Sequence, residues 1–269
     1  MAATRDSAGP GDDWIRLAGV KGFVDGSLGS TTALFFDPYL DMPSSRGLLV
    51  TPEDSLRAWI GAADSAGLQV VVHAIGDRAN ALLLDIYDSV FTAHGARDRR
   101  FRIEHAQHLR QEDIPRFAAL GVLPSMQPYH AVDDGRWAAK RIREPQLRGT
   151  YAFRSLLDSG ARLMFGSDWY VAPIDPLLGI WAAVTRETLD GKNPGGWYPE
   201  QKITVDEALR AYTAANAYGT FGEARRGVLR AGMAADVTVL DHDIRAIPAD
   251  SIRTTGILAT IVGGKVVYQ

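Results

Sequence analysis

The sequence predicts an α/β fold in which parallel strands alternate with helices. Three short apolar runs each end in a side chain that can bind a metal ion, namely His73, His105 and Asp168. Apolar runs of this length are typical of buried strands in a parallel sheet, and side chains that follow such strands meet at one rim. A helix-length stretch, residues 77–94, separates the first two runs, so the segment from His73 to His105 has the size of one βα repeat.

Composition favours a folded globular enzyme over a nucleic-acid or membrane protein. Hydrophobic residues make up 46% of the chain and the formal net charge is -3, so neither binding to nucleic acid nor binding to a membrane surface has electrostatic support. No apolar run approaches the roughly 18 residues that a membrane span requires. The chain has no cysteine, which excludes disulfides and thiolate metal sites.

The first 13 residues are small, polar and acidic, and we expect them to be a disordered tail. They lack the basic start and apolar core of a secretion signal, so a cytoplasmic location is the default expectation. A strand is then expected over Ile15 to Val24, with Lys21 inside it, followed by a glycine-rich turn at residues 25–30. The next helix is predicted to begin with Thr51 as N-cap and to end at Gly67.

The alternation of strands and helices continues along the chain. Further strands are expected at residues 69–74, 102–106, 122–127 and 163–168, and helices at residues 78–94, 111–120, 151–159, 177–189 and 205–221. Thr204 and Glu207 form the pattern of a capping box at the start of the last helix. Residues 131–148 are charged and contain Trp137, which favours a lid or a loop beside the substrate over a core segment.

The pattern changes near the carboxyl end. Residues 228–240 and 257–268 alternate between apolar and polar side chains, and Gly263-Gly264 lies between two such runs. These features predict a small β module with a two-residue hairpin, appended to the α/β part.

Imidazole and carboxylate groups at the ends of neighbouring strands indicate a site for a divalent ion, with zinc as the first expectation. A histidine by itself is more often a structural hydrogen-bonding group, but His73 and His105 recur at successive strand ends. Asp168 could both bind the ion and accept a proton from metal-bound water; the alternative is a turn or N-cap aspartate. Lys21 is either a rim residue with its amine in solvent or a desolvated amine available for covalent chemistry.

Six motifs occur in order along the chain: residues 20–30 (VKGFVDGSLGS), 73–79 (HAIGDRA), 103–107 (IEHAQ), 127–128 (QP), 166–168 (GSD) and 227–236. Together they resemble the amidohydrolase superfamily, in the family 3 branch that contains N-substituted formamide deformylase and related metal-dependent hydrolases. The resemblance extends over almost the whole chain from Trp14 onward.

The resemblance implies a partial TIM-type (β/α)8 barrel, with strands corresponding to strands four to eight, over residues 14–222. Residues 223–269 would form part of a small β-sandwich. By the same resemblance, Lys21 corresponds to a lysine that is carboxylated to bridge metals, His73 and His105 to metal ligands, and Asp168 to the metal ligand that takes the proton from water. In this chain alone we expect Lys21 to remain mostly an ordinary amine.

Four further positions correspond to rim residues near the substrate in that family: Asp77, Gln107, Gln127 and His130. The implied activity is hydrolysis of C–N bonds, amide or N-formyl, in a small-molecule substrate. The alternative is a catalytically inactive fragment that serves as a folding or interaction module. Self-association into a homo-oligomer is also compatible with the sequence, because incomplete sheet edges pair readily.

The chain departs from the family at its start. Members of the family carry a His-x-His pair before the lysine strand, whereas all six histidines of this chain follow Lys21. We therefore expect the sequence to represent the carboxyl-terminal portion of a longer enzyme; a deliberate truncation and a naturally shortened enzyme are the alternatives. His94 and His242 are expected to be solvated, and His108 to be exposed rather than close to the site.

Overall fold

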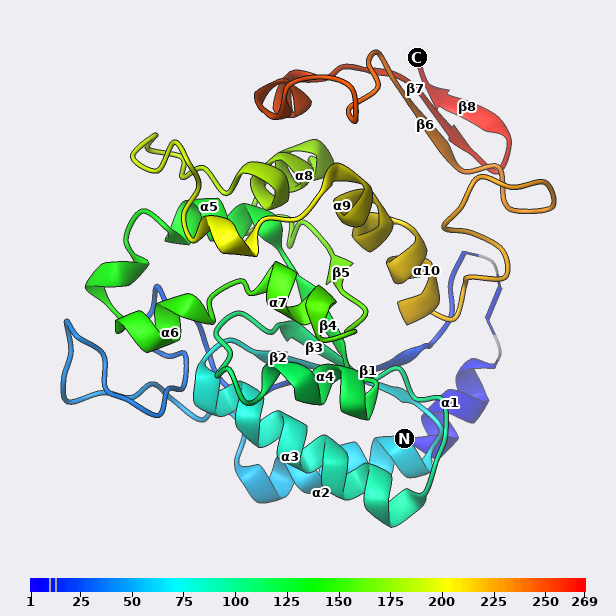
Figure 1. Cartoon of the computed structure of the whole chain (residues 1–269). Coiled ribbons are helices and arrows are strands. Elements are labelled where there is room, and N and C mark those ends of the chain that lie inside the picture. Colours follow the sequence, from blue (N-terminus) through cyan, green and yellow to red (C-terminus); the bar gives the residue numbers. More distant parts are fainter. Residues whose placement is uncertain (10, 13) are drawn as a thin grey trace. The chain divides into compact units, whose positions relative to one another are not determined.

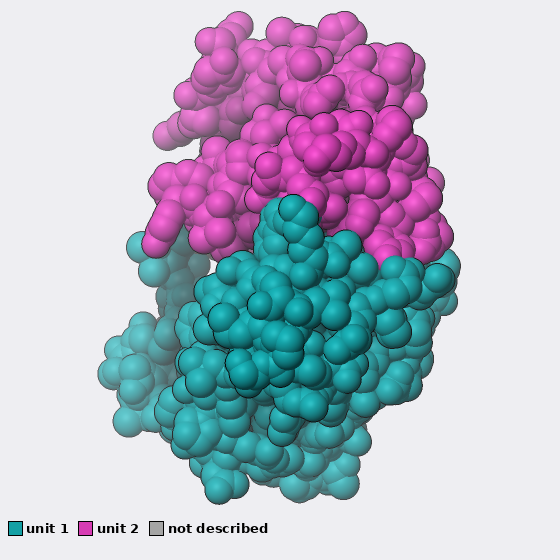
Figure 2. Space-filling view, turned by 90° about the vertical axis from the view of Figure 1, so that its left-hand side faces the viewer, with its two compact units in different colours: residues 1–126, 137–162 teal, residues 127–136, 163–269 magenta. Residues whose placement is uncertain are grey.

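The computed structural model spans residues 1–269 and describes all of them except residues 10 and 13. The chain divides into two compact units, coloured separately in Figure 2. Unit 1 comprises residues 1–126 and 137–162, and unit 2 comprises residues 127–136 and 163–269. This division differs from the expected boundary between residues 222 and 223, which stays a prediction.

Unit 1 is built on four parallel strands that follow one another in chain order (Figure 1). They are β1 (Gly19–Phe23), β2 (Gln69–Ala74), β3 (Arg102–His105) and β4 (Leu123–Met126). Among the described residues β1 pairs with β2 alone, so it is an edge strand as expected. The register sets Phe23 beside His73 and His73 beside Glu104. Carboxyl ends of these strands therefore lie at one edge of the sheet.

The two faces of this sheet differ in polarity because successive side chains of a strand point to opposite sides. On one face Val70, Val72 and Ile103 are at most 2% exposed, and helices α2 (Glu53–Ser65) and α3 (Asp77–His94) pack on this side of the strands (Figure 1). The opposite face carries more polar and less buried side chains, namely Lys21, Phe23, Val71, His73, Arg102 and Glu104. His73 therefore lies on the more polar face of the sheet.

Several shorter helices complete unit 1. They are α1 (Ala2–Ala8), α4 (Ile114–Leu120), α6 (Glu144–Arg148), α7 (Phe153–Asp158) and the 3-10 turn η1 (Ala138–Lys140). Helix α1 occupies part of the segment that was expected to be disordered, and the Arg5 guanidinium donates a hydrogen bond to the carbonyl of Ala66. Residues 137–148 are likewise more ordered than the expected lid loop, because η1 and α6 lie within them.

Unit 2 contains the short strand β5 (Met164–Phe165) and a group of helices. These are α5 (Pro128–Asp134), α8 (Pro176–Thr185), α9 (Val205–Tyr212), α10 (Ala214–Gly219) and the 3-10 turn η2 (Pro199–Gln201). The single helix expected over residues 205–221 is broken at Thr213, whose φ of -120° and ψ of -84° are not helical. The capping box of Thr204 and Glu207 is confirmed at the start of α9.

A separate antiparallel sheet ends the chain. It consists of β6 (Val237–Leu240), β7 (Ile257–Val262) and β8 (Lys265–Tyr268), with the 3-10 turn η3 (Ala249–Thr254) before β7. Gly263 and Gly264 both have positive φ and connect β7 to β8, which confirms the predicted hairpin. The chain is thus α/β, with parallel strands and a small antiparallel sheet. Within the described part of the chain, every helix is too short or too polar to cross a membrane.

Candidate active site

His73 and His105 lie on the adjacent strands β2 and β3, and their ring centroids are 4.5 Å apart. Strand alternation alone would direct His105 to the same side as Ile103, which is fully buried. His105 instead has a φ of 74° and Ala106 a φ of 44°, so the backbone turns into the left-handed region where β3 ends. This local turn of the backbone accompanies the approach of the two imidazoles, which lie close together on neighbouring strands as expected.

The contacts of His73 define which of its nitrogens carries a proton. Its Nε2 lies 2.9 Å from the carbonyl oxygen of Gly26 and 3.5 Å from Oδ1 of Asp25. Because the carbonyl can only accept, Nε2 carries a proton; when the imidazole is neutral, the lone pair is therefore on Nδ1. A neutral imidazole in this state can bind a metal ion through Nδ1.

Lys21 is exposed on β1, directly opposite Val71 in the register with β2. Its ammonium lies 4.8 Å from the ring centroid of Phe23, within the range of a cation–π contact. The side chain belongs to the same face of the sheet as His73, since Val71 and His73 are two residues apart. Of the two interpretations of Lys21, its exposure fits a rim lysine.

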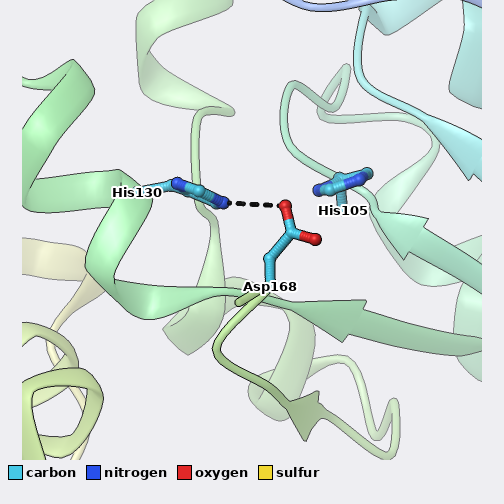
Figure 3. Close-up of side chains that lie close together, drawn as sticks. All are labelled: His105, His130 and Asp168. Carbon is cyan, nitrogen blue, oxygen red and sulfur yellow. Dashed lines mark hydrogen bonds and ion pairs between the residues drawn. The ribbon is translucent and has the colours of Figure 1, made fainter. Parts of the chain in front are cut away.

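In unit 2, Asp168 and His130 form an ion pair when the histidine is protonated (Figure 3). Nε2 of His130, in α5, lies 3.3 Å from Oδ2 of Asp168, which follows β5. Asp168 has a φ of 58°, and its carbonyl accepts hydrogen bonds from the amides of Val171 and Ala172. The residue therefore starts a tight turn and does not cap a helix. Its carboxylate is directed to His130 and is a third exposed, so it remains accessible to a ligand.

Three other expected substrate residues are buried. Asp77 is the first residue of α3, and its Oδ1 accepts the amide of Phe36 at 2.9 Å, so it anchors the loop after β1. Burial raises the pKa of Asp77. Gln107 is 4% exposed and contacts His108, and Gln127 is 5% exposed and precedes α5 as its N-cap. His130, also one of the four expected substrate residues, contacts the candidate catalytic residue Asp168.

Asp25 is a residue whose importance was not predicted. Its carboxylate is 1% exposed and accepts the amides of Leu34, Ile75 and Gly76. It thereby ties the end of β1, the following loop and the end of β2 together, close to His73. Burial outweighs these three hydrogen bonds and raises the pKa of Asp25 to about 7. Its position directly after a strand, like that of Asp168, was the signal in the sequence.

One expectation about a histidine was wrong. His108 is fully buried, because its ring is enclosed by Phe35 and Tyr151 and its Nδ1 contacts the hydroxyl of Thr150. His94 is exposed, as expected, and its Nδ1 also lies 2.8 Å from the carboxylate of the buried Asp64. Nothing in the local pattern of hydrophobic residues distinguishes His108 from an exposed histidine.

The sequence matches the amidohydrolase family over residues 1–268. The chain belongs to this family. It is 44% identical over 257 residues to the protein LONG AFTER FAR-RED 3 of Arabidopsis thaliana, and 33% identical over 256 residues to the putative amidohydrolase YtcJ of Bacillus subtilis. Each match covers 95% of this chain but only 44% and 48% of the respective relative, so the chain spans less than half the length of these proteins.

Solved structures of metal-dependent hydrolases also resemble this chain over part of their length. An uncharacterized metal-dependent hydrolase from Pyrococcus horikoshii is 34% identical with a TM-score of 0.79, covering 93% of this chain and 50% of that one. Its counterpart from Pyrococcus furiosus is 36% identical with a TM-score of 0.72, covering 83% and 44%. The predicted family and the predicted fold class, part of a TIM-type barrel with a small β-sandwich portion, are confirmed. The family is one of hydrolases, and the two Pyrococcus structures are described as metal-dependent hydrolases.

Proposed function

We propose that this amidohydrolase chain contributes a divalent-metal site for the hydrolysis of C–N bonds, amide or N-formyl, in small molecules. The observation that carries the proposal is the pair of imidazoles, His73 and His105, held 4.5 Å apart at the ends of adjacent strands. N-substituted formamide deformylase of Arthrobacter pascens, 30% identical over 211 residues, gives the proposed substrate class through its name. That match covers 77% of this chain and 38% of the relative.

The donor groups fit a metal of intermediate hardness. We assign Lys21, His73, His105 and Asp168 as ligands, and neutral imidazoles with a carboxylate form a donor set that zinc prefers in catalytic sites. In the neutral state His73 has its lone pair on Nδ1, because Gly26 accepts the proton on Nε2. In a longer enzyme that supplies further ligands, Lys21 would join the set as a carbamate, whose oxygens can coordinate an ion as its ammonium cannot. In this chain alone we expect Lys21 to remain mostly an ordinary amine. Zinc is accordingly the proposed ion.

A bound divalent ion would polarise the substrate carbonyl and lower the pKa of a bound water to about 7. Asp168 is the proposed proton acceptor, since a carboxylate beside the attacking water can take its proton and pass it to the leaving nitrogen. His130, 3.3 Å from Asp168, orients this carboxylate and can donate a hydrogen bond to the substrate once Asp168 moves toward water. Asp77, Gln107 and Gln127 are proposed to surround the substrate, with Asp77 acting through the loop that it anchors.

Hydrolysis of a secondary N-alkylformamide by the metal-free protein and by the protein supplied with zinc tests this function. We expect product only with zinc, and we expect Asp168→Asn to lower kcat by at least about 100-fold with little change in KM, because the variant keeps its size but cannot accept the proton. Equal turnover by Asp168→Asn and the natural sequence would exclude the proposed role of Asp168.

A second candidate function is a folding or interaction module without turnover. The open arrangement of β1 at the sheet edge favours it, because such an edge can pair with another polypeptide. Zinc binding without any formamide hydrolysis would favour this second function. A cytoplasmic location is also proposed. The chain is further proposed to self-associate through the edge strand β1, and size-exclusion chromatography with light scattering tests this self-association.

A further inference from the structure

We propose that Phe23 is a specificity-determining residue, which contacts an apolar substituent on the nitrogen of a formamide or amide bound beside His73. This role deepens the proposed function and rests on it in one respect, the binding of the substrate beside His73. The observations that carry it are the register of β1 with β2, the contacts of the Phe23 ring and its exposure, all of them within unit 1.

Phe23 is the last residue of β1, and the register of the sheet sets it level with His73. Lys21 comes two residues earlier on the same strand and lies opposite Val71. Because side chains alternate between the two sides of a strand, Phe23 and His73 share the more polar face of the sheet. Their ring centroids are 5.3 Å apart, a distance at which two rings are in contact. Phe23 therefore lies directly beside a proposed metal ligand.

An exposed apolar side chain is common at a protein surface, so the exposure of Phe23 gains its meaning from the neighbouring His73. Phe23 is 47% exposed even though its ring contacts His73 and the ammonium of Lys21 lies 4.8 Å from its ring centroid. Nearly half of its surface thus remains in solvent after both contacts are made. A ligand that covers this surface removes apolar area from water, which favours binding.

The neighbour on the other side of His73 is charged. Glu104 lies opposite His73 on β3, and its Oε1 is 3.3 Å from Nε of Arg102. The side chains of Glu104 and Arg102 are 17% and 21% exposed, so an apolar group placed over this ion pair would remove the remaining water from two charges, at a cost. The apolar part of a ligand beside His73 is therefore expected on the side of Phe23.

The strength of the preference follows the apolar area that the ligand covers. Compared with a methyl group, a benzyl group on the nitrogen brings several more carbons against the ring of Phe23, and two aromatic rings gain a further contribution from their geometry. Part of the benzyl group stays in solvent, because Phe23 lies on an edge strand. We therefore expect N-benzylformamide to bind about 10-fold more tightly than N-methylformamide.

NMR titration of the zinc-supplied whole chain with N-benzylformamide and N-methylformamide tests this contact. The titrated chain carries Asp168→Asn, so that the two probes are not consumed. We expect a Kd about 10-fold lower for N-benzylformamide, and nuclear Overhauser effects from the benzyl protons to the rings of Phe23 and His73. This readout needs no change at position 23. Binding of neither probe, or benzyl contacts with other residues and none with Phe23, would overturn the role of Phe23.

Two substitutions in the same chain separate apolar contact from a general structural effect. Phe23→Leu keeps an apolar side chain and should retain most of the preference, whereas Phe23→Gln is polar and should reduce it to about 2-fold or less. Trp59→Leu is the matched control and should keep the full preference, because Trp59 is 51% exposed on α2, which packs on the opposite face of the sheet. An undiminished preference in Phe23→Gln, or the same loss in Trp59→Leu, would contradict the assignment.

Hydrolysis of the same two compounds by the zinc-supplied natural sequence separates this role from the proposed function. We expect kcat/KM to be about 10-fold higher for N-benzylformamide. Equal kcat/KM for the two compounds would contradict the role of Phe23 and leave the proposed function standing. Hydrolysis of neither compound, together with a binding preference that depends on Phe23, would contradict the proposed function and leave recognition by Phe23 standing.

Discussion

At the scale of single residues, burial decides the behaviour of His108. Its ordinary pKa of 6.5 is lowered to about 3 because the charged imidazolium would lose its hydration inside unit 1. Between these two pH values the unfolded chain binds a proton at His108 and the folded chain does not. Folding stability therefore rises with pH across this window, and it is lost as the pH falls from about 6.5 toward 3.

We predict that His108→Asn removes this contribution to the pH dependence. Over the window one proton separates the two states, which corresponds to about 1.4 kcal/mol of unfolding free energy per pH unit. Urea unfolding at several pH values between 4.5 and 8 measures the slope, and the slope is informative even if the variant is less stable overall. Identical slopes for the variant and the natural sequence would show that His108 does not remain neutral in the folded state.

The side chain of Asp64 is buried, yet its carboxylate stays ionised. Burial by itself raises its pKa, but the hydrogen bonds from Arg99 and His94 and the charge of Arg97 outweigh burial and lower it. The carboxylate is 1% exposed, and the side chain of Arg99 is 5% exposed. Removing the charge would leave the guanidinium of Arg99 buried beside a neutral amide.

We expect Asp64→Asn to lower the free energy of unfolding by about 3 to 5 kcal/mol, as is typical when one partner of a buried pair is lost. Asp243→Asn is the matched control, because Asp243 pairs with Arg245 at the surface, where the two side chains are 51% and 60% exposed. That change should have little effect on the free energy of unfolding. Chemical denaturation of both variants makes the comparison, and similar losses would contradict the role assigned to burial.

At the scale of elements, the amino end of α9 has a complete capping box. The hydroxyl of Thr204 accepts the amide of Glu207, and the carboxylate of Glu207 accepts the amide of Thr204 at 2.8 Å. We predict that Thr204→Ala destabilises the protein by about 1 kcal/mol, while Thr204→Ser has little effect because it keeps the hydroxyl. Thermal unfolding monitored by circular dichroism distinguishes them; equal melting temperatures for Thr204→Ala and Thr204→Ser would contradict the cap.

Elements with strong local signals were predictable from the sequence. The strand that contains His73, β2, was predicted from its apolar residues Val70 to Val72, and the hairpin at Gly263-Gly264 from its two glycines. The division of residues 205–221 into α9 and α10 was not, because no proline or glycine marks the break at Thr213. A non-helical residue within a stretch of good helix formers is set by packing, which a local pattern does not encode.

In the candidate site, too, features set by local sequence were predictable and features set by distant contacts were not. His73 and His105 could be predicted as neighbours, because parallel strands in chain order bring their carboxyl ends together. The left-handed backbone of His105 had no signal, since non-glycine residues rarely adopt it. The burial of His108 also had none, because it depends on contacts with Thr150, 42 residues away in the chain.

At the scale of the whole molecule, the chain is a member of the amidohydrolase family that spans less than half the length of the two relatives described above. The proposed function requires that the strand-end side chains of this chain hold a divalent metal ion. Of the proposed ligands, the two imidazoles at the ends of β2 and β3 can be substituted together most cleanly.

Zinc-edge X-ray absorption of the zinc-loaded chain tests this requirement most directly, with the natural sequence compared to the His73→Ala, His105→Ala double variant. For the natural sequence we predict a shell of nitrogen and oxygen ligands at about 2.0–2.2 Å from zinc, together with the outer scattering of imidazole rings. In the double variant we predict loss of that outer scattering. His242→Ala, which changes an exposed histidine paired with Asp241, should leave the spectrum unchanged. Identical spectra for the natural sequence and the double variant would contradict the metal site.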